Sequence, residues 1–387
     1  EQAGARNRRV YLDYLSTCPL LDDVREAMLP CLFQRFGHPG SLHQEGLAAR
    51  DTIKRARAEL ASLLNAESPE TILFTGSPAE AMNLGVKGAA LALRRAGTHL
   101  ITSTAEQPAV AQSIDFLEAQ GFSCTRVPVD AQGRFDPSAV RAALRDDTIL
   151  VCLHHANLDL GTLQPIHEIG ALTSERGVTL FVDATASAGW IPVDVQALKA
   201  DLAALAPHRF HGPKGVGVLY RHRRARLAHL LHGVDLNSGE NVAEIAGAGE
   251  AARIARRELP ARESHTRRLQ TLFLSELGRR VPHLKLNGPP PGPARLPHSL
   301  NLSLEFLEGE GLALMLDVRG VAVASGAACV TQTMRVPPIL AAIGLPESLA
   351  RGNVLVSFAQ ETTEQEVRFA VDTLAKAAAD LREMSPL

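Results

Sequence analysis

The stretch from residue 71 to residue 93, TILFTGSPAEAMNLGVKGAALAL, contains the two patterns that decide the fold. Residues 71–76 form a short apolar run that ends at a glycine, which is typical of a strand, and residues 77–93 have the spacing of a helix. Ser77, Pro78 and Glu80 supply an N-cap, a first-turn proline and the acidic half of a capping box. The stretch therefore predicts a strand followed directly by a helix.

The same alternation continues on both sides of this stretch. Helices are expected at 46–64, 108–120 and 165–176, and strands at 99–103, 123–129, 148–156, 178–184, 202–206 and 215–221. Strands that alternate with helices of about 10 to 15 residues predict βαβ units and a mostly parallel sheet. Ligands of such sheets bind at the carboxyl ends of the strands. Four residues fall at these ends: Gly76, His155, Asp183 and His208.

A smaller α/β region is predicted in the last third of the chain. It follows a long helical stretch at 242–281 and a proline-rich loop at 286–298. Further strands are expected at 299–305, 320–326 and 354–359, with helices at 336–343 and from about 363 to 382. Two domains also suit a chain of 387 residues, since single cores stop growing at about 250–300 residues. We place the large domain at 15–257 and the small domain at 1–14 and 258–387.

Composition excludes several classes of protein. The 40 basic and 42 acidic residues are interspersed, so no overall field favours nucleic acid or an anionic membrane. No apolar run approaches the roughly 18 residues of a membrane span, and no signal-peptide pattern is present. Five cysteines without a CxxC pair argue against a disulfide framework or a zinc site. We expect a cytoplasmic protein with reduced thiols that binds neither nucleic acid nor membrane.

Four residues have side chains suited to catalysis or ligand binding, and for each a purely structural role is the alternative. Asp183 ends an apolar strand, where a carboxylate can hold a pyridinium nitrogen protonated or can cap the next turn. His155 and His208 follow strands and are either hydrogen-bonded structural histidines or ligands and bases. Cys329 lies in the small-residue stretch ASGAACVTQT (324–333), which either presents a thiol to a partner or buries it.

Taken together, these stretches resemble the cysteine desulfurase family, in the class V aminotransferase group with the fold-type I PLP-transferase architecture. The stretches that match in order and spacing are 10–46, 71–88, 146–161, 182–195, 208–220 and 324–333. The resemblance implies a homodimer that binds pyridoxal phosphate (PLP) and releases sulfur from L-cysteine to iron–sulfur scaffolds or thiolation proteins. In the long-loop branch of the family, Cys329 corresponds to the nucleophile that carries the persulfide. It is also the one candidate ligand for a cluster metal.

The resemblance also shows where this chain departs from the family. The lysine that binds PLP as a Schiff base falls at Arg209, and a guanidinium cannot condense in that way. Lys214 matches a second family lysine with a different place. Positions that contact the cofactor ring, its phosphate or the substrate are also changed, at Gln107, Leu158, Ala186, Ala79, Ala206, Glu240, Tyr14 and Leu355. We therefore expect that the protein uses no PLP and forms no covalent bond with it. We also expect no cysteine desulfurase activity.

Three functions follow as hypotheses. The first is a desulfurase-like homodimer that acts through Cys329 as a sulfur-relay acceptor, a cluster-ligand donor or a docking scaffold, with an iron–sulfur scaffold or sulfur-acceptor protein as partner. The second is an enzyme that acts on another ligand through Arg209, His155, His208 and Asp183, unless Arg209 and Asp183 simply form an ion pair. The third is a PLP-dependent cysteine desulfurase, which requires noncovalent cofactor binding.

Overall fold

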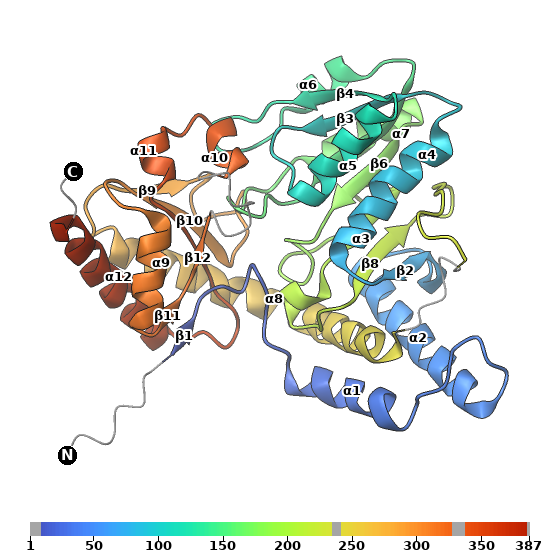
Figure 1. The fold of residues 1–387 in the computed structure, drawn as a ribbon, viewed down its shortest axis with the longest axis horizontal. Helices are drawn as coiled ribbons and strands as arrows, with labels where there is room; N and C mark the ends of the chain where they lie inside the picture. The colour runs from blue at the N-terminus through green and yellow to red at the C-terminus, as the bar shows by residue number, and fades with distance from the viewer. Residues whose placement is uncertain (1–8, 234–240, 327–336, 385–387) are drawn as a thin grey trace.

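The computed structural model describes residues 9–233, 241–326 and 337–384, and its largest element is a seven-stranded sheet (Figure 1). The strands lie in the order β2-β8-β7-β6-β5-β3-β4. Their bounds are β2 (Ile72–Thr75), β3 (His99–Ser103), β4 (Ser123–Val127), β5 (Thr148–His154), β6 (Thr179–Asp183), β7 (Leu202–Leu205) and β8 (Gly217–Arg221). Only β8 runs in the direction opposite to the other six strands of this sheet. The predicted α/β fold with a mostly parallel sheet is confirmed.

The reversal at β8 follows from the connection that precedes it. Between β7 and β8 the chain makes only the short helix η3 (Pro207–Phe210) and a glycine-containing turn. A parallel neighbour needs a longer crossover, so β8 returns antiparallel to β7. Because β2 is in turn antiparallel to β8, it points the same way as β7. The loops after β2, β5, β6 and β7 therefore meet at one edge of the sheet.

Helices cover both faces of this sheet, and the strand side chains alternate between the two apolar layers. On β6, Leu180 and Val182 belong to one buried cluster and Phe181 belongs to the other. The first face is covered by α2 (Gln44–Leu63), α6 (Pro137–Ala143), α7 (Ile166–Arg176) and the first part of α8 (Val242–Leu277); the second by α3 (Pro78–Asn83), α4 (Ala89–Leu93) and α5 (Pro108–Ala119). Burial on both faces explains why the strands read as continuous apolar runs.

The stretch at 71–93 folds as a strand and a helical segment with a local irregularity. Ser77 accepts a hydrogen bond from the Glu80 amide at 3.1 Å, as expected of the N-cap. The Glu80 carboxylate, however, accepts from the Gly76 amide at 2.8 Å rather than from Ser77. Between α3 and α4 the helix widens into the π-helical turn η2 (Leu84–Gly88). Gly85 is needed there, since a Cβ at this position would stand 2.4 Å from the Phe181 ring.

A smaller α/β region contains a four-stranded antiparallel sheet, β12-β13-β10-β9, and the parallel pair β1-β11. Its strands are β1 (Val10–Tyr11), β9 (Leu284–Asn287), β10 (Ser299–Leu304), β11 (Val321–Ala322), β12 (Ala324–Ser325) and β13 (Asn353–Ser357). Its helices are α9 (Gly309–Val318), α10 (Pro338–Ala342), α11 (Glu347–Ala350) and α12 (Glu364–Met384). Val10 and Leu12 share a buried cluster with α8, α9 and α12.

Helix α8 runs from the large sheet into the smaller region, as Figure 1 shows in yellow and light orange. Its residues Ala251 and Ala252 pack under the large sheet, whereas Leu269 and Phe273 pack in the smaller core. The domain limits at 15–257 and 258–387 stay a prediction. The sequence patterns did not predict β1, β9, α6, α9, α11, η1 (Pro69–Thr71) or α1 (Asp22–Phe33).

In the three described ranges, no helix has both the length and the hydropathy that a membrane crossing requires. The cytoplasmic location stays a prediction from the sequence.

Candidate functional site

Three of the residues singled out in the sequence lie at the carboxyl edge of the large sheet. Asp183 is the last residue of β6, His155 directly follows β5, and His208 lies in η3, after β7. The His155 amide donates to the Asp183 carbonyl at 2.8 Å, which joins the ends of the two strands. Parallel neighbours end on the same side, so the strand pattern correctly placed these side chains at one edge.

The Asp183 carboxylate is buried, at 4% exposure, and hydrogen bonds reach both of its oxygens. One oxygen accepts from the Thr185 amide at 2.9 Å, and the other accepts from the side-chain amide of Gln107. Gln107 is the N-cap residue of α5, but its side chain makes no capping bond and is available for this contact. The same amide nitrogen also lies 3.1 Å from the Thr185 hydroxyl.

Arg209 is held by its backbone and extends its side chain to the end of β6. Its carbonyl accepts from the Trp190 indole at 2.7 Å and from the Cys18 thiol at 3.2 Å. One terminal guanidinium nitrogen donates to the Thr185 hydroxyl at 2.9 Å. Asp183, which the sequence suggested as an ion-pair partner of Arg209, instead accepts hydrogen bonds from the Gln107 side chain and the Thr185 amide. Arg209 thus places a fixed positive charge beside Thr185.

The two histidines at this edge are neutral at neutral pH. Burial, followed by the neighbouring His154, lowers the pKa of His155 to about 4, and the ring lies 2.9 Å from the Ser187 hydroxyl. Burial, followed by Arg209 and Lys214, lowers the pKa of His208 to about 4. Each ring can donate or accept a hydrogen bond, but neither supplies a charge to a ligand.

Asp159, which the sequence patterns did not select, lies in the loop that follows β5 at this edge. Burial raises the pKa of its carboxyl group to about 6, although the charges of Arg209 and His154 oppose the change. Its carbonyl accepts from the Asn301 side chain at 3.1 Å, which connects β10 of the smaller sheet to the loop after β5. An acidic residue shortly after a buried strand, in NLDLG (157–161), was the available signal. A carboxyl group with this pKa can exchange a proton near neutral pH.

Among the residues that the structure describes, the other positions marked by the resemblance add no charged group to this edge. Cys329 and Glu240 lie outside the described residues. The following side chains have no polar atom: Ala79, exposed; Leu158, half-buried; and Ala186, Ala206 and Leu355, buried. Tyr14 is buried, with its ring edge-on to Tyr11 at 5.0 Å.

The residues at this edge fit PLP in part. Asp183 is a buried carboxylate at a strand end and suits the ring nitrogen of such a cofactor, provided that Gln107 releases one oxygen. Arg209 does not fit the covalent link, because a guanidinium is not a nucleophilic amine at any pH at which a protein folds. The site therefore suits a ring held by noncovalent contacts.

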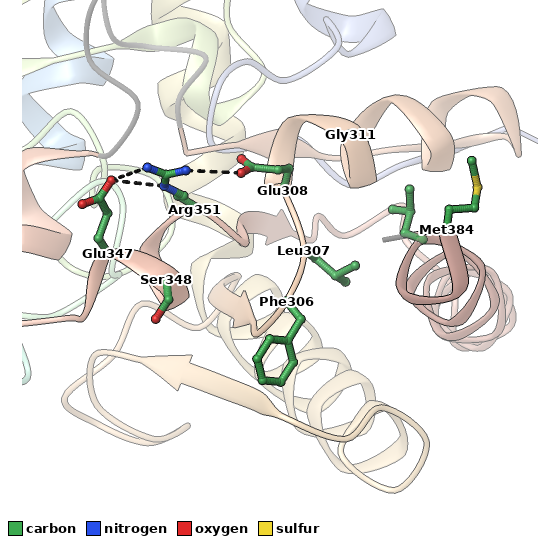
Figure 2. Close-up of a pocket in the computed structure, with 9 residues that line it drawn as sticks. Phe306, Leu307, Glu308, Gly311, Glu347, Ser348, Arg351 and Met384 are labelled. Atoms are coloured by element: carbon green, nitrogen blue, oxygen red, sulfur yellow. Dashed lines mark hydrogen bonds and ion pairs between the residues drawn. The ribbon is translucent and has the colours of Figure 1, made fainter. Parts of the chain in front are cut away.

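A cavity of about 700 Å³ lies elsewhere, in the smaller region (Figure 2). Phe306, Leu307 and Met384 supply part of its apolar lining. The guanidinium of Arg351 lies between Glu347, at 2.6 Å, and Glu308, at 3.8 Å, so its charge is already compensated. None of the residues described above at the strand ends lines this cavity.

Known proteins resemble this chain over nearly its whole length. The family model of class-V aminotransferases matches residues 10–369. A protein named "Cysteine desulfurase IscS" from Dictyoglomus turgidum is 38% identical over 98% of this chain and 97% of its own. A solved structure titled "NIFS-LIKE PROTEIN" superposes with a TM-score of 0.89, at 28% identity over 96% of this chain and all of that one. A structure titled "SspA in complex with cysteine" has a TM-score of 0.77, at 30% identity over 92% of this chain and all of that one.

This similarity contradicts two expectations from the sequence. The first was that the chain lacks desulfurase activity and serves only as a relay or scaffold; the second was that it uses no PLP. Both expectations were inferred from single substituted positions, chiefly Arg209, whereas the similarity spans 98% of the chain. Loss of a covalent anchor removes one contact with a cofactor, whereas Asp183 and the surrounding strand ends are present. The chain belongs to the class-V aminotransferase family and, within it, to the cysteine desulfurases.

Proposed function

We propose that this protein is a PLP-dependent enzyme that removes sulfur from L-cysteine. The observation that carries the proposal is the full-length similarity to a named cysteine desulfurase, in a chain that retains the buried Asp183 at the end of β6. The similar structure titled as a complex with cysteine supports the choice of substrate. Iron–sulfur scaffolds or other sulfur acceptors are the corresponding partners, and a homodimer is the corresponding assembly.

PLP, when bound, supplies an electron sink for bonds to the substrate's α-carbon. Asp183 is the residue that would hold the proton at the ring nitrogen, and that proton would keep the ring electron-poor. Arg209 contributes a positive charge beside Thr185 and no covalent bond. Asp159, with a pKa of about 6, is the described carboxyl group best able to accept or return a proton at this edge.

Cys329 is the proposed sulfur acceptor, on the strength of the family resemblance and its small-residue stretch. The carbon–sulfur bond of cysteine breaks, a sulfur–sulfur bond forms on Cys329, and the thiol proton balances the new carbon–hydrogen bond of alanine. L-cysteine and one thiol thus give L-alanine and one persulfide, with no external oxidant or reductant. Four other cysteines lie within the described residues, and the buried Cys18, Cys31 and Cys152 are poorly placed for such transfer.

The proposal is tested first by cofactor and product. The full-length chain is saturated with PLP, freed of excess, and assayed for retained cofactor and for alanine formed from cysteine. Asp183→Asn should lower PLP affinity by about tenfold or more, since the ring nitrogen loses its anionic partner. Asp194→Asn is the matched control, because Asp194 caps a turn through the Gln196 and Ala197 amides and accepts a hydrogen bond from the exposed Asn65 side chain, away from the strand ends. Absence of retained cofactor and of alanine in the parent chain would disprove the proposal.

The sulfur acceptor is tested separately by thiol labelling and mass spectrometry after exposure to cysteine. Cys329→Ser should abolish the protein-bound persulfide and reduce alanine formation by at least tenfold. Cys124→Ser is the control, because Cys124 lies half-buried in β4 and burial raises its pKa to about 11. A persulfide that survives in Cys329→Ser would assign the acceptor role to another thiol.

A further inference from the structure

We infer that Gln107 competes with the cofactor ring for Asp183 and thereby sets the affinity of this site for PLP. The inference rests on the proposed function and names the residue that limits cofactor binding. Gln107 belongs to the site itself, and its side chain donates to the Asp183 carboxylate that the cofactor ring needs as its acceptor.

The contacts around Asp183 leave no free oxygen for a ring nitrogen. One oxygen is held by the Thr185 amide, which belongs to the backbone and cannot leave without moving the loop after β6. The other is held by the Gln107 side chain, which can rotate away. With 4% exposure, the carboxylate has little access to water as a substitute donor. Each oxygen keeps a second lone pair, but Gln107 is the movable donor of the two, so we place the ring nitrogen where Gln107 now binds.

Gln107 can leave without disrupting the helix that it precedes. It occupies the N-cap of α5, but its side chain makes no bond to the first helical amides, and the next residue is Pro108. Thr185 stays anchored after such a rotation, because Arg209 donates to the same hydroxyl at 2.9 Å. Gln107 is thus the movable member of the group formed by Gln107, Asp183, Thr185 and Arg209.

Replacement of the Gln107 amide by the ring nitrogen at Asp183 explains why Gln107 should reduce the affinity for PLP. In the parent chain, binding of the ring breaks one charge-assisted hydrogen bond to Asp183 and forms another of the same kind, so little is gained. In a chain without the Gln107 amide, the buried oxygen lacks a donor until the ring arrives, and the whole bond counts toward binding. The ligand class is an aromatic ring with a protonated nitrogen, because the ring N–H replaces the amide N–H as a donor to the carboxylate.

The test compares PLP affinity in Gln107→Met and Gln107→Ala with that of the parent chain. Gln107→Met keeps the length of the side chain and removes its donor, and Gln107→Ala removes both. Gln120→Ala is the control, because Gln120 is exposed at the opposite end of α5. The single tryptophan of the chain, Trp190, is bonded to the Arg209 carbonyl and provides a fluorescence signal for the titration.

We expect both Gln107 variants to bind PLP about tenfold or more tightly than the parent, and Gln120→Ala to match the parent. The cofactor-free Gln107→Met protein should also melt a few degrees lower, by roughly 2–4 °C, since Asp183 loses a donor, and added PLP should reverse the loss. Equal or weaker binding by the variants beside a parent that binds PLP overturns the inference and leaves the proposed function intact. Absence of binding in every chain overturns both, and an unchanged melting temperature of cofactor-free Gln107→Met also overturns the inference.

Discussion

Glu106 and Gln107 are neighbours in the loop between β3 and α5, but they enter different surroundings. One oxygen of Glu106 accepts from the Ser103 hydroxyl at 2.6 Å and lies 3.0 Å from His154, inside the protein. Gln107 reaches the opposite way, to Asp183 and Thr185 at the strand ends. The same loop thus stabilises the core through one residue and occupies the candidate site through the next.

His154, at the end of β5, and His155, which follows it, also differ in that one contacts the core and the other contacts the candidate site. His154 contacts Glu106, lies 3.1 Å from the Gln164 amide and packs edge-on against Phe135, with ring centroids 4.7 Å apart. His155 bonds to Ser187 on the site side. Successive side chains of an extended segment point to opposite sides, so one step along the chain separates a structural group from a site group. Substitutions should therefore separate into effects on chemistry and effects on stability.

Arg209→Lys should produce the largest change, and it should be chemical. A primary amine at this position can bond covalently to PLP, which the guanidinium cannot do. We expect stoichiometric covalent cofactor after borohydride reduction of the variant and none in the parent, measured by intact mass. Arg224→Lys is the control, because the exposed Arg224 pairs with Asp201 away from the strand ends that hold Asp183. Covalent cofactor in the parent would point to another lysine, for which peptide mapping should examine Lys214 first.

Glu106→Ala should mainly reduce stability. It leaves the buried His154 without its carboxylate, and loss of one partner of a buried polar pair costs about 3 kcal/mol of unfolding free energy. Glu106→Gln should cost less, because the amide oxygen still accepts a hydrogen bond. Urea denaturation measures both. A large loss of PLP affinity in Glu106→Gln at unchanged stability would contradict the assignment of Glu106 to structure.

The burial of His155 beside His154 also predicts that the stability of the fold depends on pH. The folded pKa of His155, about 4, lies below its ordinary value near 6.5 because the ring is buried beside His154. Below pH 6.5 the unfolded chain binds a proton that the folded chain excludes, so stability falls as the pH drops from 6.5 toward 4. His155→Gln should make this slope shallower by up to roughly 1.4 kcal/mol per pH unit.

The acid dependence is measured from denaturant unfolding at several pH values. His229→Gln serves as the control because His229 is exposed, and its slope should match that of the parent. An unchanged slope in His155→Gln would mean that other groups produce the acid sensitivity.

Arg126→Gln should have the smallest effect. Arg126 pairs at the surface with Glu118 at 2.5 Å and Asp115 at 2.8 Å, both on the helix that follows Gln107. Exposed ion pairs contribute at most about 1 kcal/mol, and salt screens them. Denaturation at low and high salt should show a small loss that shrinks with salt. A loss as large as that of Glu106→Ala would remove the contrast between buried and surface polar groups.

Much of the fold could be predicted from patterns in the chain, because the sheet is apolar on both faces and its connections are short. Strand β3 was predicted with its observed bounds, and Ser77 was correctly identified as a helix cap. Short elements such as β9 and α11 were missed, since four residues hold too little periodic signal. The antiparallel direction of β8 was missed as well, because the strand pattern alone does not specify direction.

The candidate site was predictable only at the positions that directly follow strands. Asp183 and His155 could be placed at one edge, and the chemistry of Arg209 excludes a Schiff base wherever the side chain lies. The link between Gln107 and Asp183 could not be read in this way, because the two residues are 76 positions apart and meet only when β3 and β6 lie in one sheet.

The amino-acid sequence by itself determined the alternation of strands and helices, the family to which the chain belongs and the absence of an amine at position 209. These depend on local periodicity, on matching stretches and on side-chain chemistry. Only the tertiary structure decided that Gln107 donates a hydrogen bond to Asp183, that Arg209 donates to Thr185 and that desolvation raises the pKa of Asp159 to about 6. Hydrogen-bond partners and solvation belong to residues brought together by packing, and spacing along the chain does not specify them.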